Sequence, residues 1–532
     1  MKCPVLHDKT SPAELAFLHS EFDRAAVLYQ EELQQNPNDT VATIGLIHTL
    51  LKQQKVKEAS ELIQKAVATQ PQSAALLASQ AEIQYRQGTP WEAERTANSA
   101  SNLDPCNPQL HLLRAKLLRL SSYYKSSAAE IRTAHQLDPD DPSIRLHWLE
   151  TLPTTQRISE LESYLASPTG DDPEEIRRLH FYLDYLKKQR EQPHRACRLV
   201  SDTSSTTIPF APMMQDANRI RAFGLDVKLN DHNARLEIDT GAGGLLISRS
   251  VANRAGLQQF SKNETSGIGD KGHQAAYTAF VDSIKIGSLE FRDCEVEVLD
   301  QRSIIDSDGL IGTDVFSRFL VTLDYPMRKL LLAPLPPRPD DPTPVSPTLE
   351  TTSTPEEEPD DEKSIPANET NKPATPKVVS PGPRDRYISP EMKTWTPVYR
   401  LGHNLMLPAV LNNSISGLKL FVLDTGAFTT TISPTVAREV TKVRADNRTV
   451  VKGISGKVDK VYSADEITFR FANISQKVRN VVAFDTPGVS KGMGMDISGF
   501  IGFSALGQTT MKIDYRDGLV SFGYDANRGY RF

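Results

Sequence analysis

Cysteine is scarce in this chain of 532 residues. No two of its cysteines show the CxxC spacing that is typical of zinc sites. Small disulfide-stabilised domains carry cysteine at a much higher density. We therefore expect no zinc site, no disulfide framework and four reduced, structural thiols, at Cys3, Cys106, Cys197 and Cys294.

Long apolar runs and an excess of positive charge are missing too. No stretch approaches the ~20 apolar residues of a membrane span, so none is expected. The first ten residues, MKCPVLHDKT, lack the apolar core of a signal peptide, which favours the cytoplasm. A true start further upstream would instead favour the periplasm or secretion. The net charge of −6 argues against nucleic acid as a partner.

The motifs of common metal and nucleotide sites are also missing. The 11 histidines are scattered, with no HExxH pair, and no phosphate-binding GxxxxGKS or GxxxxGKT loop occurs. The glycines of GIGDKG, at 267–272, lack the strand–loop–helix frame of a dinucleotide site. We expect neither a metal nor a cofactor.

What the first third of the chain does contain is a repeat. Proline fits just after a helix end, since it cannot continue a helix. Small residues twelve positions earlier would let two antiparallel helices pack closely. The prolines recur every 34 residues, at Pro37, Pro71, Pro105, Pro139 and Pro173, and the alanines are Ala25, Ala59 and Ala93.

Period, alanines and terminal proline together resemble the tetratricopeptide repeat (TPR) over residues 12–175. The large aromatic residue near the start of a TPR is absent from most units. The resemblance implies an all-α solenoid, which we assign to residues 1–200, with a concave groove. That groove would bind a protein partner or peptide, or the array would serve only as a spacer or dimerisation unit.

A proline-rich segment divides the rest of the chain. Between Pro334 and Pro390 lie 15 of the 35 prolines, in an acidic stretch rich in Ser and Thr. Such a composition cannot bury enough surface to offset its ordering entropy. We expect a disordered linker at 334–394 and a short linker at 201–218, with β-type segments at 219–333 and 395–532.

The two β-type segments carry the same motif. The first reads LEIDTGAGGLLIS around Asp239, and the second reads FVLDTGAFTTTIS around Asp424. Further on come DGLIGTD and SGFIGFS, which contain Gly312 and Gly502. Two matched copies make chance a poor explanation.

An apolar strand followed by Asp-Thr-Gly-Ala, with a downstream Ile-Gly, resembles the aspartic peptidase superfamily and bacterial retropepsin-like domains in particular. The resemblance implies two all-β barrel lobes after the TPR solenoid, each giving one catalytic aspartate, Asp239 and Asp424. The pair would share a proton, activate a water and hydrolyse a peptide bond without a covalent intermediate. Which aspartate is protonated stays open.

The resemblance also gives roles to neighbouring residues. The threonines of both motifs should hydrogen-bond across the lobe interface, and the glycines should let the backbone approach the carboxylates. A strand should pass tightly beside each aspartate loop at Gly312 and Gly502. These supporting residues are Thr240, Gly241, Thr425, Gly426, Gly312 and Gly502.

Two glycine-bearing turns are flap candidates, although plain hairpin turns are an equal alternative. Their glycines are Gly267 and Gly269 in lobe 1, and Gly453 and Gly456 in lobe 2. Ala242 and Ala427 stand where pepsin-like enzymes often have a hydroxyl that lowers the carboxylate pKa. Their presence predicts a less acidic working pH, which a pH–rate profile peaking well below pH 4 would contradict.

Two functions are consistent with these motifs. In the first, the lobes pair within one chain as a pseudo-dimer and form an aspartic endopeptidase with a peptide or protein substrate. In the alternative, the array and the lobes form a non-catalytic scaffold for protein binding and dimerisation. The linker would also allow pairing between chains. The intact Asp-Thr-Gly triplets favour the enzyme.

Overall fold

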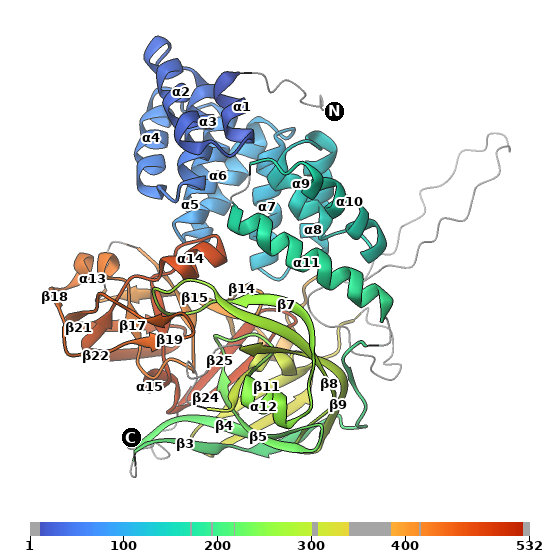
Figure 1. The fold of residues 1–532 in the computed structure, drawn as a ribbon. Helices are drawn as coiled ribbons and strands as arrows, with labels where there is room; N and C mark the ends of the chain where they lie inside the picture. The colour runs from blue at the N-terminus through green and yellow to red at the C-terminus, as the bar shows by residue number, and fades with distance from the viewer. Residues whose placement is uncertain are drawn as a thin grey trace, which may run out of the picture.

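The computed structural model describes residues 11–170, 173–192, 195–216, 219–299, 307–339, 385–413 and 417–524. A helical array at the N-terminal end sits on a β-rich region (Figure 1). The prediction of a TPR-like solenoid followed by two all-β lobes is confirmed. Most of the linker predicted at 334–394 lies outside the described residues.

The helical array follows the 34-residue period. Short polar residues cap alternate helices at the same position of successive repeats: the side chains of Asp39, Ser73, Asn107 and Asp141 each accept a backbone N–H three residues on. The helices are α1 (Pro12–Leu18), α2 (Phe22–Gln35), α3 (Thr40–Lys52), α4 (Val56–Thr69), α5 (Ala74–Arg86), α6 (Pro90–Leu103), α7 (Pro108–Leu120), α8 (Tyr124–Leu137), α9 (Pro142–Leu149), α10 (Thr154–Ala166) and α11 (Pro173–Glu191).

The recurring alanines explain the close packing of this array. Ala25, Ala59 and Ala93 are fully buried between helices. A larger side chain at these positions would push the neighbouring helices apart. The final helix, α11, is longer than the others and runs back across the β-rich region (Figure 1). It therefore links the array to the first lobe.

Lobe 1 is built on a twisted sheet with strand order β1-β9-β6-β10-β5-β4-β8-β7. Apolar side chains at alternate strand positions are buried in one contiguous cluster, which extends into lobe 2. The elements are β1 (Arg198–Leu199), β2 (Thr206–Pro209), β3 (Ala211–Asp216), β4 (Arg219–Leu229), β5 (His232–Asp239), β6 (Leu245–Ser248), α12 (Arg249–Arg254), β7 (Gln259–Thr265), β8 (Gln274–Ile286), β9 (Leu289–Leu299), β10 (Gly309–Gly312), η1 (Thr313–Phe316), β11 (Phe319–Asp324) and β12 (Lys329–Pro334).

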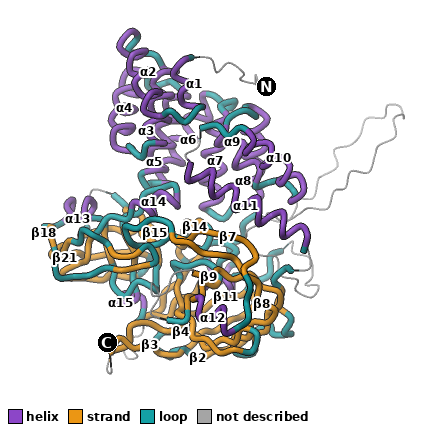
Figure 2. The backbone as a smooth tube through the Cα atoms, viewed as in Figure 1, coloured by secondary structure: helices purple, strands orange, loops and turns teal. Residues whose placement is uncertain are grey.

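Lobe 2 repeats this plan, with strand order β14-β15-β16-β23-β17-β22-β21-β18. Strands dominate both lobes, and helices dominate the array (Figure 2). The elements are η2 (Pro390–Met392), β13 (Thr396–Pro397), β14 (Tyr399–Leu401), β15 (Asn404–Leu411), β16 (Lys419–Leu423), β17 (Thr431–Ile432), α13 (Pro434–Val440), β18 (Val443–Ala445), β19 (Lys452–Gly453), β20 (Gly456–Lys457), β21 (Tyr462–Phe471), β22 (Ile474–Ala483), α14 (Pro487–Met493), β23 (Gly499–Ile501), α15 (Phe503–Leu506), β24 (Thr509–Asp514) and β25 (Leu519–Tyr524).

A third sheet joins the two lobes. Its strand order is β13-β25-β24-β11-β12-β2, so β11 of lobe 1 pairs directly with β24 of lobe 2. Val321 lies opposite Ile513 in this antiparallel pair, and both side chains are fully buried. The lobes therefore form one rigid body around a shared sheet.

The stretch at 201–218 differs from the short linker that we expected. Strand β2 in this stretch pairs with β12, and β3 pairs with β4. Ile208 and Phe210 are buried. The free energy gained by burying these apolar side chains stabilises the stretch in spite of the polar Ser and Thr residues around them.

The expectation of four reduced thiols is wrong. Cys197 forms a disulfide with Cys294, and this bond links the N-terminal end of lobe 1 to β9. Cys106 of the array is disulfide-bonded as well. Partners 97 residues apart meet only through the tertiary fold, so their spacing along the chain did not predict the bond.

The helical array and lobe 2 share a hydrophobic core. Leu113 and Leu117 of α7 belong to one buried cluster with Leu420 and Val422 of β16. Backbone contact is direct as well, because the Asp496 N–H donates to the Arg86 carbonyl at 2.7 Å. The array is thus packed onto the peptidase-like part rather than tethered to it.

Candidate active site

Equivalent strands place the two motif aspartates. Asp239 is the last residue of β5, and Asp424 follows β16 directly. Each strand is paired in parallel with the strand that ends near the downstream glycine, β10 or β23. Gly312 lies beside Asp239 in this register, and a Cβ on Gly502 would come within 2.5 Å of Thr429. Neither strand could approach so closely with a larger residue.

The motif threonines join the two half-sites. The Thr240 N–H donates to Thr425 Oγ1, and the Thr425 N–H donates to Thr240 Oγ1, both at 3.1 Å. The hydroxyls then donate to the strands of the opposite lobe, Thr240 to the Leu423 carbonyl at 2.8 Å and Thr425 to the Ile238 carbonyl at 3.1 Å. Because all of these groups are buried, the bonds hold the two loops rigidly together.

The two carboxyl groups meet at the centre of this interface. Asp239 and Asp424 are hydrogen-bonded to each other, and only 9% and 7% of their surfaces are exposed. The motif glycines make this approach feasible. A Cβ on Gly426 would lie 2.4 Å from Asp239 Oδ2, and one on Gly241 would lie 2.9 Å from Asp424 Cγ.

The two carboxyl groups accept different numbers of hydrogen bonds from backbone N–H groups. Asp239 Oδ1 accepts N–H groups from Gly241 at 2.7 Å and from Gly426 at 3.3 Å. Asp424 Oδ1 accepts the Ala427 N–H at 2.9 Å. Because N–H donors stabilise a carboxylate anion, the ionised form is better stabilised at Asp239 than at Asp424.

The pKa shifts follow this asymmetry. Burial raises the pKa of Asp424 well above its ordinary value, and the charge of Asp239 raises it further. Burial raises the pKa of Asp239 as well, but the Gly241 amide, the hydrogen bond from Asp424 and the charge of His403 lower it. The geometry therefore favours one shared proton that resides on Asp424.

The sequence motifs did not single out two residues near Asp239. Asp314 accepts the Gly244 N–H with both carboxylate oxygens, at 3.0 and 3.2 Å. It stands two residues after Gly312 in DGLIGTD, so its closeness to the motif could have pointed to it. His403 comes from the other lobe and packs on Gly243, and nothing in the sequence pattern marks it.

The two candidate flap turns touch each other. The Gly267 N–H donates to Ser455 Oγ at 3.1 Å, and the Ser455 N–H donates to the Ile268 carbonyl at 3.0 Å. A Cβ on Gly269 would lie 2.4 Å from the Ser455 backbone, so the tips are in close contact. Gly453 and Gly456 pair in the two-residue ladder of the second turn.

Helix α11 of the array holds the hairpin of the first turn. Arg177 forms two hydrogen bonds to the Glu264 carboxylate of β7, both at 3.0 Å. Glu174 bridges His273, just after the turn, and Lys491 of α14, at 3.0 and 2.8 Å. One helix therefore contacts the first flap and the second lobe.

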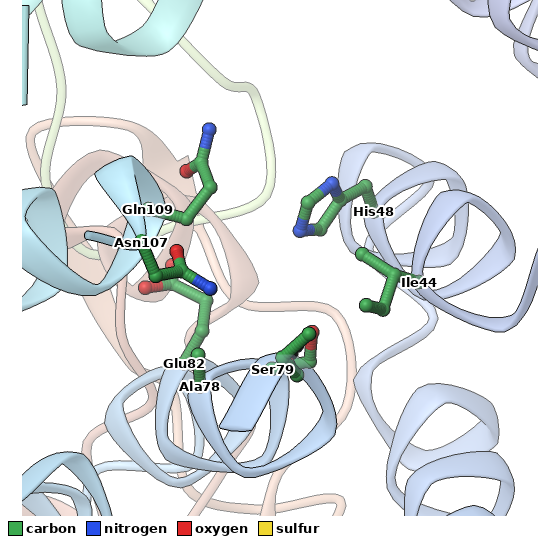
Figure 3. Close-up of a pocket in the computed structure, with 8 residues that line it drawn as sticks. Ile44, His48, Ala78, Ser79, Glu82, Asn107 and Gln109 are labelled. Atoms are coloured by element: carbon green, nitrogen blue, oxygen red, sulfur yellow. Dashed lines mark hydrogen bonds between the residues drawn. The ribbon is translucent and has the colours of Figure 1, made fainter. Parts of the chain in front are cut away.

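The inner face of the array contains a small polar cavity of about 60 Å³ between α3, α5 and α7. His48 and Glu82 lie at the same position of successive repeats, and Lys116 follows 34 residues later at 3.3 Å from Glu82. Burial lowers the pKa of His48, which favours its neutral form. His48 faces Asn107 and Gln109 across the cavity (Figure 3).

Two negative findings concern the described residues only. In that part of the chain, no group of three or more His, Cys, Asp or Glu side chains is arranged to hold a metal ion. No helix within the same ranges is long and apolar enough to cross a membrane.

Comparison with known protein families agrees with the two halves of this architecture. Residues 225–315, which include Asp239 and Asp314, match the family model described as aspartyl protease. Residues 16–83 match the tetratricopeptide repeat model. The chain thus carries an aspartyl protease-like domain after a TPR region.

Solved structures also match part of this chain. A thermophilic TPR protein of Thermus thermophilus shares 23% identity, with a TM-score of 0.25. The match covers 30% of this chain and 88% of that protein. No curated protein matches this chain in sequence.

Proposed function

We propose that this chain is an aspartic endopeptidase that cleaves peptide bonds with a water activated between Asp239 and Asp424. One observation carries the proposal: two buried carboxyl groups, one from each lobe, share a hydrogen bond inside a rigid set of cross-lobe threonine contacts. Two buried carboxyl groups in hydrogen-bond contact cannot both ionise cheaply, so the pair holds one proton and can act as acid and base together.

The asymmetric support of the pair assigns the two roles. Asp239, with two backbone N–H donors, is the anion that takes a proton from the attacking water. Burial raises the pKa of Asp424 well above its ordinary value, so Asp424 is the protonated member. It donates its proton to the oxygen of the peptide carbonyl. Asp239 then donates the proton it took from the water to the amide nitrogen of the tetrahedral intermediate, and Asp424 takes back a proton from a hydroxyl group of that intermediate. The C–N bond breaks to give an acid and an amine, and no covalent bond to the enzyme forms. The flap turns must separate for a substrate to enter.

The test is cleavage of a mixed peptide library by the full chain and by Asp239→Asn and Asp424→Asn. Each change should lower cleavage by about 10²-fold or more, since general acid–base catalysis is worth ~10²–10⁴-fold. The matched controls are Asp226→Asn in lobe 1 and Asp465→Asn in lobe 2, both exposed surface carboxylates. They should cleave like the parent chain.

Thermal unfolding separates lost chemistry from lost structure. Asparagine keeps an oxygen that can accept the backbone N–H groups and removes a buried ionisable carboxyl group, so neither site variant should unfold at a lower temperature than the parent chain. Identical products from the parent and from both site variants would end the peptidase proposal. The non-catalytic scaffold would then be the better account.

We further propose that the inner face of the array binds a peptide segment of a partner or substrate. The cavity offers neutral and charged hydrogen-bonding groups in a row along the repeats, which suits an extended backbone. A peptide library selected on the full chain should yield binders that Gln109→Ala weakens. Val27→Ala changes an exposed residue of α2 and should leave the binders unaffected. Binders that ignore both changes would contradict the assignment.

The disulfides add a proposal about the compartment. Such bonds persist mainly in oxidising environments, so we propose the periplasm or the cell exterior over the cytoplasm that the N-terminus favoured. Thiol labelling of the protein in its own cells should leave Cys197 and Cys294 unmodified until a reductant is added. Labelling of both without reductant would place the protein in a reducing compartment.

A further inference from the structure

The loop that follows Asp239 has few side chains with which to hold itself in place. It continues as Thr-Gly-Ala-Gly-Gly, and Gly244 adopts a left-handed conformation with φ of +58°. The matching positions in lobe 2 are Phe428 and Thr429. The Gly312 N–H of the neighbouring strand donates to the Gly244 carbonyl at 2.8 Å, and any side-chain support for this loop must come from outside it.

Two side chains supply this support. The Asp314 carboxylate accepts the Gly244 N–H with both oxygens. The imidazole of His403 packs against Gly243 so closely that a Cβ there would lie 2.5 Å from Nδ1. His403 is half-buried in the turn between β14 and β15, so lobe 2 reaches across to complete the half-site of lobe 1.

His403 also acts by charge. It lowers the pKa of Asp239 and of Asp314, against the burial that raises both. The other charged group near Asp314 is Arg400, which donates to the carbonyls of Gly402 and Tyr515. Arg400 also lowers the pKa of Asp314, whereas the charge of His403 acts on both Asp239 and Asp314.

We propose that His403 is a positioning residue of the candidate active site: it holds the Asp239 loop in place from the opposite lobe and favours Asp239 as the ionised member of the pair. This role rests on the proposed peptidase function.

The test compares His403→Gln with His403→Arg in the full chain, with His232→Gln on the exposed surface of lobe 1 as the control. Loss of the charge in His403→Gln should move the acidic limb of the kcat pH profile upward by about half a unit or more. KM should change less than about twofold, because the residue acts through Asp239. His403→Arg should restore the limb, and the control should not move it.

A second readout needs no activity. Carbon-13 NMR of the aspartate carboxyl groups, assigned with Asp239→Asn, should show the same upward shift for Asp239 in His403→Gln. Gly243→Ala tests the contact from the other side, since the new Cβ displaces the imidazole, and it should shift the titration in the same direction.

The possible results separate the two proposals. An unchanged Asp239 titration in His403→Gln would overturn the role of His403 even in an active enzyme. Equal shifts in His403→Gln and His403→Arg would also overturn it, because packing alone would then explain the effect. A shifted titration in a chain that cleaves no peptide would support the electrostatic role of His403 and refute the peptidase function alone.

Discussion

The two lobes carry the same motif on the same strands, yet the same face of each lobe has opposite chemistry. Four residues before the motif aspartate, lobe 1 has Arg235, in an exposed ion pair with Asp226. Lobe 2 has Leu420 at that position, and only 1% of it is exposed. Side chains alternate along a strand, so Leu420 lies on the same strand face as Asp424.

The helical array accounts for this difference. It packs Leu113 and Leu117 against the apolar face of lobe 2, whereas the equivalent face of lobe 1 meets water. An uncovered apolar face of this kind would favour aggregation. The array therefore covers an apolar face of lobe 2, whereas lobe 1 presents an exposed ion pair at the same position.

The same contrast extends to the loops beside the aspartates. Lobe 2 fixes its loop locally: Thr430 Oγ1 accepts the Gly502 N–H at 3.2 Å, and the Phe503 N–H donates to the Ala427 carbonyl at 2.7 Å. In lobe 1 the Gly312 N–H donates to the Gly244 carbonyl at 2.8 Å, and the half-buried Asp314 carboxylate and the His403 imidazole of lobe 2 add side-chain contacts. Lobe 1 is thus the half whose aspartate loop is held in part by ionisable side chains.

The largest expected effect comes from exchanging the residues at the two equivalent positions. Leu420→Arg places a charge in the core shared by the array and lobe 2, and should cost about 4 kcal/mol or more. Arg235→Leu removes an exposed ion pair and should change stability by less than ~1 kcal/mol. Denaturant unfolding followed by circular dichroism measures both. Similar small losses in the two variants would show that the array does not stabilise lobe 2.

A smaller effect should come from Glu237, which lies two residues before Asp239, where lobe 2 has Val422. Burial raises the pKa of Glu237 to about 7, although Arg221 lies 2.9 Å away and opposes the shift. The unfolded chain ionises this carboxyl at lower pH than the folded chain does. Its contribution to stability is therefore complete below about pH 4.3 and is lost as the pH rises through 7.

Glu237→Gln removes this pH dependence. At pH 8 the variant should be more stable than the parent by up to ~3 kcal/mol, and the difference should shrink towards zero at pH 4. Thermal unfolding across this range measures the effect. Glu466→Gln, on the exposed surface of lobe 2, should show no such gain at high pH. A constant difference between Glu237→Gln and the parent at every pH would contradict burial as the cause.

The sequence predicted the features that depend on local or repeated patterns, and it did not predict contacts between residues far apart along the chain. The helices follow from prolines and alanines that recur every 34 residues, and the pairing of Asp239 with Asp424 could be anticipated because one motif occurs twice. The Cys197–Cys294 bond and the contact of His403 with Gly243 could not. Both contacts join segments that come together only in the folded chain, so no local sequence pattern predicts them.

The smallest expected effect concerns the two flaps. Helix α11 of the array spans the hairpin of the first flap, and Arg177 pairs with Glu264 on its outer strand. The pair is partly exposed, so Arg177→Ala should cost less than ~1 kcal/mol and should leave the global unfolding temperature almost unchanged.

Local opening of the first flap is more sensitive than global stability. Hydrogen exchange of the amides in β7 should quicken up to about fivefold in Arg177→Ala, since 1 kcal/mol of local opening energy corresponds to that factor. Arg444→Ala removes a comparable surface pair with Asp465 in lobe 2 and should not alter exchange in β7. If β7 exchanges at the parent rate in Arg177→Ala, this pair does not restrain the hairpin. The first flap would then be no more restrained by an ion pair than the second flap.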